Sequence, residues 1–173
     1  GAGTDRNRDG YWSREEFIAN MRGGRGKPLL IAIRPGGRGD ITDTHLQWEM
    51  NRGIPEIPSP LLYNDLIYMV RNGGLLSAVD ATNGKLLYSE RLNAPGQYSA
   101  SPIGANGHVY LSSNRGTITV VKSDRQFGIA HQNNLNDPVF VTPAIDKNTL
   151  YVRTEKTFQA FRSLPDGKLN ELP

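Results

Sequence analysis

The chain of 173 residues contains no cysteine. This absence excludes disulfide bonds, zinc sites built from thiolates and thiol nucleophiles. The chain also lacks an apolar run near the ~18 residues that a membrane-spanning helix requires. We therefore expect neither a thiol-dependent enzyme nor a helix that spans a bilayer.

An excess of charge of one sign is also missing from most of the chain. The formal net charge is +3, and residues 1–40 hold eight Lys and Arg against five Asp and Glu, whereas residues 41–173 hold twelve of each. Two Gly-Gly-Arg-Gly tracts, at residues 23–26 and 36–39, lack the stacking aromatics that bind single-stranded nucleic acid. Flexible turns are the better interpretation of both tracts, and we do not expect a nucleic-acid partner.

Turn-forming residues, in contrast, are abundant, and they separate units that recur along the chain. The chain holds 19 Gly and 11 Pro. Landmarks of the stretch 59–88 return 42 positions later: Ser59-Pro60, Tyr68, Asn72 and Gly74 correspond to Ser101-Pro102, Tyr110, Asn114 and Gly116. Thr142-Pro143 and Tyr151 follow 41 positions after that. A period near 42 residues is typical of propeller blades.

The unit itself has the content of about four short strands. Residues 66–70 and 75–79 show the period-two alternation of β-strands. Residues 72–74 between them supply a tight turn, for which we expect positive φ angles at Asn and Gly. Residues 80–85 form a second turn, in which Asp80 accepts backbone N–H bonds. The sequence therefore predicts one four-stranded blade for each unit.

The run Ala78-Val79-Asp80-Ala81-Thr82-Asn83-Gly84-Lys85-Leu86-Leu87-Tyr88 resembles the A-x-D-x-x-T-G-K-x-x-W signature of the pyrroloquinoline-quinone-type propeller repeat. Asn83 replaces the usual Thr, Tyr88 replaces the usual Trp, and Lys122 replaces the Asp in the next repeat. The resemblance covers residues 29–162. This family includes quinone-dependent alcohol dehydrogenases and propellers without a cofactor, such as the bacterial outer-membrane assembly lipoprotein. The resemblance implies an extracytoplasmic location, although no export signal is visible in this chain.

We predict an all-β fold, a partial β-propeller of about three and a half four-stranded blades, preceded by a short EF-hand loop and helix. The expected units are residues 1–22 (EF-hand loop and exiting helix), 23–49 (partial blade), 50–91, 92–131 and 132–173 (blades, the last with a tail). The run 29–33 is expected to be a buried strand of the partial blade, which ends at Trp48. Since a closed propeller needs roughly four to eight blades, we expect a fragment whose terminal blades expose apolar faces.

Residues 5–16 fit the twelve-residue calcium loop of an EF-hand at every diagnostic position. The expected oxygen ligands are Asp5, Asn7, Asp9, the Tyr11 carbonyl, Ser13 directly or through water, and both oxygens of Glu16. A capping box from Ser13 to Glu16 opens a helix that ends at Gly23-Gly24. Trp12 and the lack of an entering helix depart from the pattern, so we expect weak binding, on the order of 10⁻⁴–10⁻³ M. An acidic turn without metal is the alternative.

Other candidates for chemistry are few, and no residue is predicted to be catalytic. Residues 23–27 resemble a phosphate-binding loop, but Pro28 stands where Ser or Thr is required. His45, His108 and His131 are expected at the surface or in turns, and Tyr68, Tyr110 and Tyr151 between blades. We predict a binding or scaffolding module with calcium, and a protein partner on the propeller face. A part of a quinone-dependent alcohol or sugar dehydrogenase is the alternative function.

Overall fold

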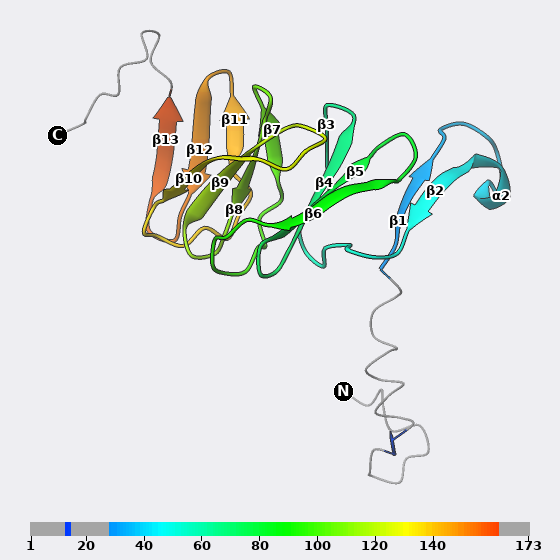
Figure 1. Ribbon diagram of the computed structural model, residues 1–173, viewed down its shortest axis with the longest axis horizontal. Coiled ribbons are helices and arrows are strands. Elements are labelled where there is room, and N and C mark those ends of the chain that lie inside the picture. The colour runs from blue at the N-terminus through cyan, green and yellow to red at the C-terminus, as the bar shows by residue number, and fades with distance from the viewer. Residues whose placement is uncertain (1–12, 15–27, 163–173) are drawn as a thin grey trace.

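The computed structural model describes residues 13–14 and 28–162, and these residues form a partial β-propeller. Figure 1 shows antiparallel sheets standing side by side along the long axis of the molecule. The first sheet pairs β1 (Leu30–Ile33) with β2 (Leu46–Met50), and a short helix, α2 (Thr42–His45), lies between them in the chain. The prediction of an all-β partial propeller is confirmed.

The next two sheets are complete blades, with their strands in chain order. The first complete blade, called blade A, contains β3 (Leu61–Tyr63), β4 (Leu66–Arg71), β5 (Leu75–Asp80) and β6 (Leu86–Arg91). The second, blade B, contains β7 (Ile103–Ala105), β8 (His108–Ser112), β9 (Thr117–Lys122) and β10 (Ile129–Asn134). The last sheet, blade C, contains β11 (Ala144–Asp146), β12 (Thr149–Arg153) and β13 (Phe158–Arg162). No helix occurs between residues 61 and 162.

Strand register shows that the blades are copies of one another. Tyr68 pairs with Ala78 in blade A, Tyr110 pairs with Val120 in blade B, and Tyr151 pairs with Ala160 in blade C. Between blades A and B both partners shift by 42 residues, as the repeat predicts.

A register irregularity recurs at the same place in three sheets. It falls between Ala32 and Ile33, between Ala78 and Val79, and between Ile129 and His131. A bulge inserts one unpaired residue into a strand, so it determines which residue of that strand is paired next to it. Trp48, Tyr88 and His131 therefore hold corresponding positions, paired with Ala32, Ala78 and Val120.

The tight turns of blades A and B also correspond. The Gly74 N–H donates to the Arg71 carbonyl and the Gly116 N–H donates to the Ser113 carbonyl, each at 3.0 Å. Their φ angles are +70° and +84°, a region that glycine adopts without a Cβ penalty. The predicted positive φ at the turn asparagines is wrong: Asn72 and Asn114 use their side-chain oxygens to accept N–H groups of Tyr98 and Gln97.

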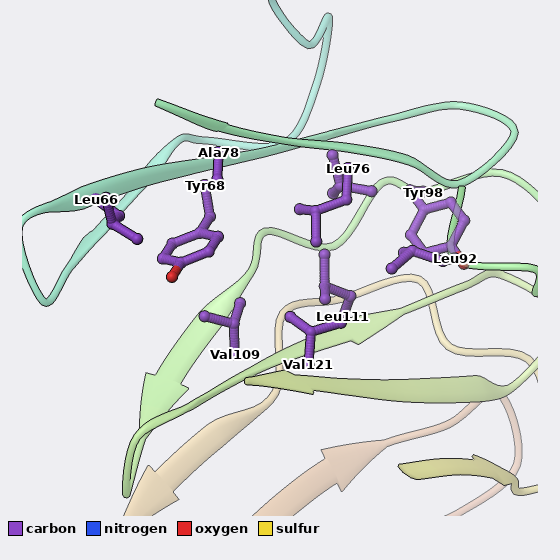
Figure 2. Close-up of a cluster of buried hydrophobic side chains, with 10 residues drawn as sticks. Leu66, Tyr68, Leu76, Ala78, Leu92, Tyr98, Val109, Leu111 and Val121 are labelled. Carbon is purple, nitrogen blue, oxygen red and sulfur yellow. The ribbon is translucent and has the colours of Figure 1, made fainter. Parts of the chain in front are cut away.

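The hydrophobic core lies between neighbouring sheets. Figure 2 shows Leu66, Tyr68 and Leu76 of blade A pointing toward side chains of blade B. The partners from blade B are Val109, Leu111 and Val121, each fully buried. A second cluster joins Ile118 and Val120 of blade B to Val152 of blade C. Blade stacking therefore supplies most of the apolar burial.

The two end sheets expose apolar side chains, as expected for an open arc. Leu76 and Ile118, at the same position of blades A and B, are 0% and 4% exposed, whereas the corresponding Phe158 of blade C is 68% exposed. The predicted burial of the run 29–33 is wrong, because Ile31 and Ile33 are 42% and 49% exposed and no described sheet covers that face of β1.

Candidate functional site

The predicted calcium loop lies almost entirely outside the described residues. Asp5, Asn7, Asp9, Tyr11 and Glu16 are not described, and Ser13 is half-buried. Elsewhere in the described chain, no group of three or more His, Asp and Glu side chains is arranged to hold a metal ion. The calcium site therefore stays a prediction.

Asp80, at the end of β5, is held in the turn that the sequence predicts. Its Oδ1 accepts hydrogen bonds from the Thr82 hydroxyl and from the Thr82 N–H, and its Oδ2 accepts one from Arg125 Nη2 at 2.6 Å. The Thr82 hydroxyl, followed by Arg125, lowers the pKa of Asp80 to about 2. Because Arg125 lies between β9 and β10, this carboxylate links blades A and B.

The tyrosines at the repeated position pack between blades wherever a following blade is present. Tyr68 is fully buried, and its hydroxyl donates to Ser123 Oγ of blade B at 3.0 Å. Burial raises the pKa of Tyr68. Tyr110 packs against the cluster shared by blades B and C, and Tyr151 stacks on Phe158 with ring centroids 6.1 Å apart. The predicted position of Tyr68 and Tyr110 between blades is confirmed.

The three histidines are not brought together. His45 Nδ1 lies 2.7 Å from the Thr44 hydroxyl, and His108 Nδ1 lies 2.8 Å from the Asn106 carbonyl oxygen. His131 is exposed on β10. Their predicted place at the surface or in turns is confirmed.

The Ser-Pro and Thr-Pro pairs that mark the repeat form a row of hydrogen bonds from blade to blade. The Ser59 N–H donates to Ser101 Oγ at 2.8 Å, and the Ser101 N–H donates to Thr142 Oγ1 at 2.9 Å. Each hydroxyl therefore fixes the first strand of one blade to the start of the blade before it.

One concave region of the described chain combines charged and apolar side chains, and we call it the arginine pocket. It has a volume of about 320 Å³ and lies between the linker that enters blade A, residues 51–58, and the tight turn of that blade. The side chains that matter most here are Arg71, Arg91, Glu56, Ile54, Ile57 and Leu75. Ligand sites in proteins are concave, largely apolar and begin near this size.

The two arginines of the pocket stand on one face of the sheet. Arg71 pairs with Leu75 and Leu75 pairs with Arg91, so the three side chains form a row across β4, β5 and β6. With strands about 4.8 Å apart, the Cβ atoms of the arginines are about 10 Å apart. Arg91 Nη1 donates to the Gly73 carbonyl at 3.2 Å, whereas Arg71 Nε is buried without a partner among the described residues.

Sequence reasoning missed this pocket. Arg71 and Arg91 are 20 positions apart and belong to no motif. A signal was nevertheless present in the repeat: the corresponding positions of blade B hold Ser113 and Asn134, which are neutral. The cations are present in blade A and absent from blade B, so they are not required for a blade to form.

Comparison with known proteins shows the fold. No protein-family model and no curated protein sequence matches the chain. BamB from Moraxella catarrhalis matches with a TM-score of 0.61 and 17% identity. The match covers 79% of this chain and 40% of BamB. A quinohemoprotein alcohol dehydrogenase from Pseudomonas putida gives a TM-score of 0.52 with 14% identity over 62% of this chain and 23% of its own.

A designed protein matches this chain over most of the length of both chains. The computationally designed Ika4 matches with a TM-score of 0.56 and 15% identity over 80% of this chain and 87% of its own. At such identities the likeness concerns the fold alone, and that fold is the quinoprotein-like propeller that the repeat signature resembles. No helix in the described ranges is long and apolar enough to cross a membrane.

Proposed function

We propose that this chain is a non-catalytic part of a quinoprotein-like propeller and acts as a binding or scaffolding module. The observation that supports the proposal most is the use of its reactive side chains as blade-to-blade contacts. Asp80 is bonded to Thr82 and Arg125, and its pKa of about 2 makes it a poor general base at neutral pH. The Tyr68 hydroxyl is likewise bonded to Ser123.

An oxidation assay tests this proposal. The full chain is mixed with pyrroloquinoline quinone, calcium, an electron-accepting dye and a panel of alcohols and sugars. We expect no dye reduction above a control without protein. Dye reduction that disappears when the quinone is left out would overturn the proposal.

The alternative is a part of a quinone-dependent alcohol or sugar dehydrogenase. The structural likeness to the quinohemoprotein alcohol dehydrogenase favours it. In enzymes of this family the quinone lies near the ring axis and is contacted by several blades, so an open arc loses the positioning on which the rate depends. The same assay on the full-length parent protein separates the two functions, because only the dehydrogenase would reduce the dye.

We also propose that the loop 5–16 binds calcium in preference to magnesium. Its donor set of carboxylates, an amide, a hydroxyl and a backbone carbonyl suits a hard cation, and a bidentate Glu16 favours the larger ion. Calorimetry with millimolar calcium should detect a heat of binding, and the substitution Glu16→Gln should abolish that heat. The matched control is Glu15→Gln, which removes a neighbouring carboxylate that is not at a ligand position and should leave the heat unchanged. No heat with the unaltered chain would contradict the site.

A protein partner on the propeller face and an extracytoplasmic location complete the proposal. Resemblance to the outer-membrane assembly lipoprotein, a propeller without a cofactor, supports both. Cell fractionation of the full-length parent protein tests the location, and recovery in the cytoplasmic fraction alone would contradict it. The neutral composition of residues 41–173 predicts no shift of nucleic acid in a gel assay.

A further inference from the structure

We propose that the arginine pocket binds a carboxylate carried by an apolar group. This inference deepens the proposed binding function and rests on it. The carboxylate would be held by Arg71 and Arg91, and the apolar group would lie against Ile54, Ile57 and Leu75.

The pocket is open because the linker and the tight turn are not tied together as they are in the other blades. In blade B the Asn114 N–H donates to the Gln97 carbonyl, and the Gln97 N–H donates to Asn114 Oδ1, both at 2.8 Å. In blade C the Glu155 N–H donates to the Pro138 carbonyl at 2.8 Å. These bonds draw the linker onto the turn.

Blade A lacks the corresponding bond. Pro55 lies 42 positions before Gln97, but its carbonyl accepts no backbone hydrogen bond from Asn72 in the described chain. Asn72, the counterpart of Asn114, accepts the Tyr98 N–H of the following linker at 3.0 Å instead. No backbone hydrogen bond joins residues 51–58 to residues 71–75 in the described chain. The gap left between them is the arginine pocket.

The charge of the pocket favours an anion. It contains two guanidinium groups and one carboxylate, that of Glu56. Blade B has Ser113, Thr117 and Asn134 at the positions of Arg71, Leu75 and Arg91, so a blade forms without these cations. Arg71 Nε is buried without a partner among the described residues, and burying an N–H donor in this way is unfavourable.

The shape and lining select the kind of anion. Guanidinium groups match the planar carboxylate with paired, charge-assisted hydrogen bonds. Inorganic phosphate would leave the apolar wall, Ile54, Ile57 and Leu75, without contact. A carboxylate attached to an aliphatic side chain uses both parts of the pocket, as would a free acyl amino acid or the last residue of a peptide.

An NMR titration of the full ¹⁵N-labelled chain tests the proposal. The probes are N-acetyl-leucine and N-acetyl-leucinamide, which differ only in the carboxylate. The signals to follow are the side-chain Nε–H groups of Arg71 and Arg91 and the backbone of Leu75. We expect the acid to shift these signals and to bind at least about tenfold more tightly than the amide. The amide has no carboxylate, so neither arginine can form a charge-assisted hydrogen bond with it.

Two variants localise the effect. Arg91→Gln should weaken binding of the acid at least about tenfold. The matched control, Arg115→Gln, removes an exposed cation from the corresponding turn of blade B and should leave binding unchanged. Equal binding of acid and amide, or unchanged binding in Arg91→Gln, overturns the proposal.

The source of the carboxylate is read from a third probe. A capped five-residue peptide ending in a free leucine should bind more tightly than N-acetyl-leucine if the site is made for a peptide terminus, and equally if it is made for a small acid. Both results support the carboxylate site. The oxidation assay reads a different property, so the non-catalytic function and this pocket can each fail alone.

Discussion

The sharpest prediction compares one repeat position in two blades. Leu76 of blade A and Phe158 of blade C pair with Val70 and Arg153 at the same place in their sheets. Leu76 is fully buried against blade B, whereas Phe158 is 68% exposed. If burial depends on the following blade, truncation to alanine should destabilise the protein strongly at residue 76 and only slightly at residue 158.

The expected magnitudes differ several-fold. Leu76→Ala removes a fully buried side chain and leaves a cavity, which typically costs about 2–5 kcal/mol in the free energy of unfolding. Phe158→Ala removes a ring that is mostly in water and stacks on Tyr151, so its cost should be about 1 kcal/mol or less. The larger loss corresponds to a fall in the melting temperature of roughly 2–4 °C per kcal/mol.

Urea unfolding followed by circular dichroism measures both variants under the same conditions. The free energies of unfolding of Leu76→Ala and Phe158→Ala are each compared with that of the unaltered chain. Equal losses, or a larger loss at Phe158, would refute the argument that a following blade covers Leu76 and no described blade covers Phe158.

Three further predictions concern the contacts between and within blades. Because the pKa of Asp80 lies at about 2 in the folded protein against an ordinary 3.8, its stabilising contribution is present above about pH 4 and is lost as the pH falls toward 2. Asp80→Asn should therefore reduce the loss of stability between pH 4 and pH 2 in urea titrations, and an unchanged loss would count against the contact. Gly116→Ala should lower the melting temperature more than Gly74→Ala, since a Cβ would lie 2.5 Å from a backbone oxygen at the first site and 3.2 Å from the nearest atom at the second; the reverse order would be inconsistent with these contacts. Trp48→Phe should cost about 1 kcal/mol in urea unfolding, because the indole N–H donates to the Ala81 carbonyl at 3.0 Å, and no loss would speak against that bond.

Much of the fold could be predicted from the sequence because the blade repeats. The spacing of Tyr68 and Tyr110, and of Gly74 and Gly116, carries over into register and turn geometry without change. Period-two alternation and glycine-rich turns are local signals, and local signals survive without knowledge of the neighbouring blades.

What could not be predicted depends on the neighbours of each segment. The apolar run 29–33 indicated burial, but apolarity does not say which sheet covers a strand, and Ile31 and Ile33 stay exposed. The two-residue turn of Asn64 and Asp65, both with positive φ, was also missed, because Asn-Asp is a weaker turn signal than Asn-Gly.

The candidate site was invisible for a related reason. The row of Arg71, Leu75 and Arg91 exists only once β4, β5 and β6 are paired. The missing bond between residues 51–58 and the turn of blade A becomes evident only by comparison with the bonds of blades B and C. The calcium loop is the reverse case: the sequence predicts it strongly, but it lies almost entirely outside the described residues, which therefore do not test it.

The central claim is that polar side chains which could serve in acid–base chemistry, such as Asp80 and Tyr68, instead hold neighbouring blades together. A double-mutant cycle on Tyr68→Phe and Ser123→Ala tests it most directly, because the Tyr68 hydroxyl donates to Ser123 Oγ at 3.0 Å across the interface between blades A and B. The account predicts a coupling of about 0.5–1.5 kcal/mol in the free energy of unfolding. Additive losses, with no coupling between the two substitutions, would contradict it.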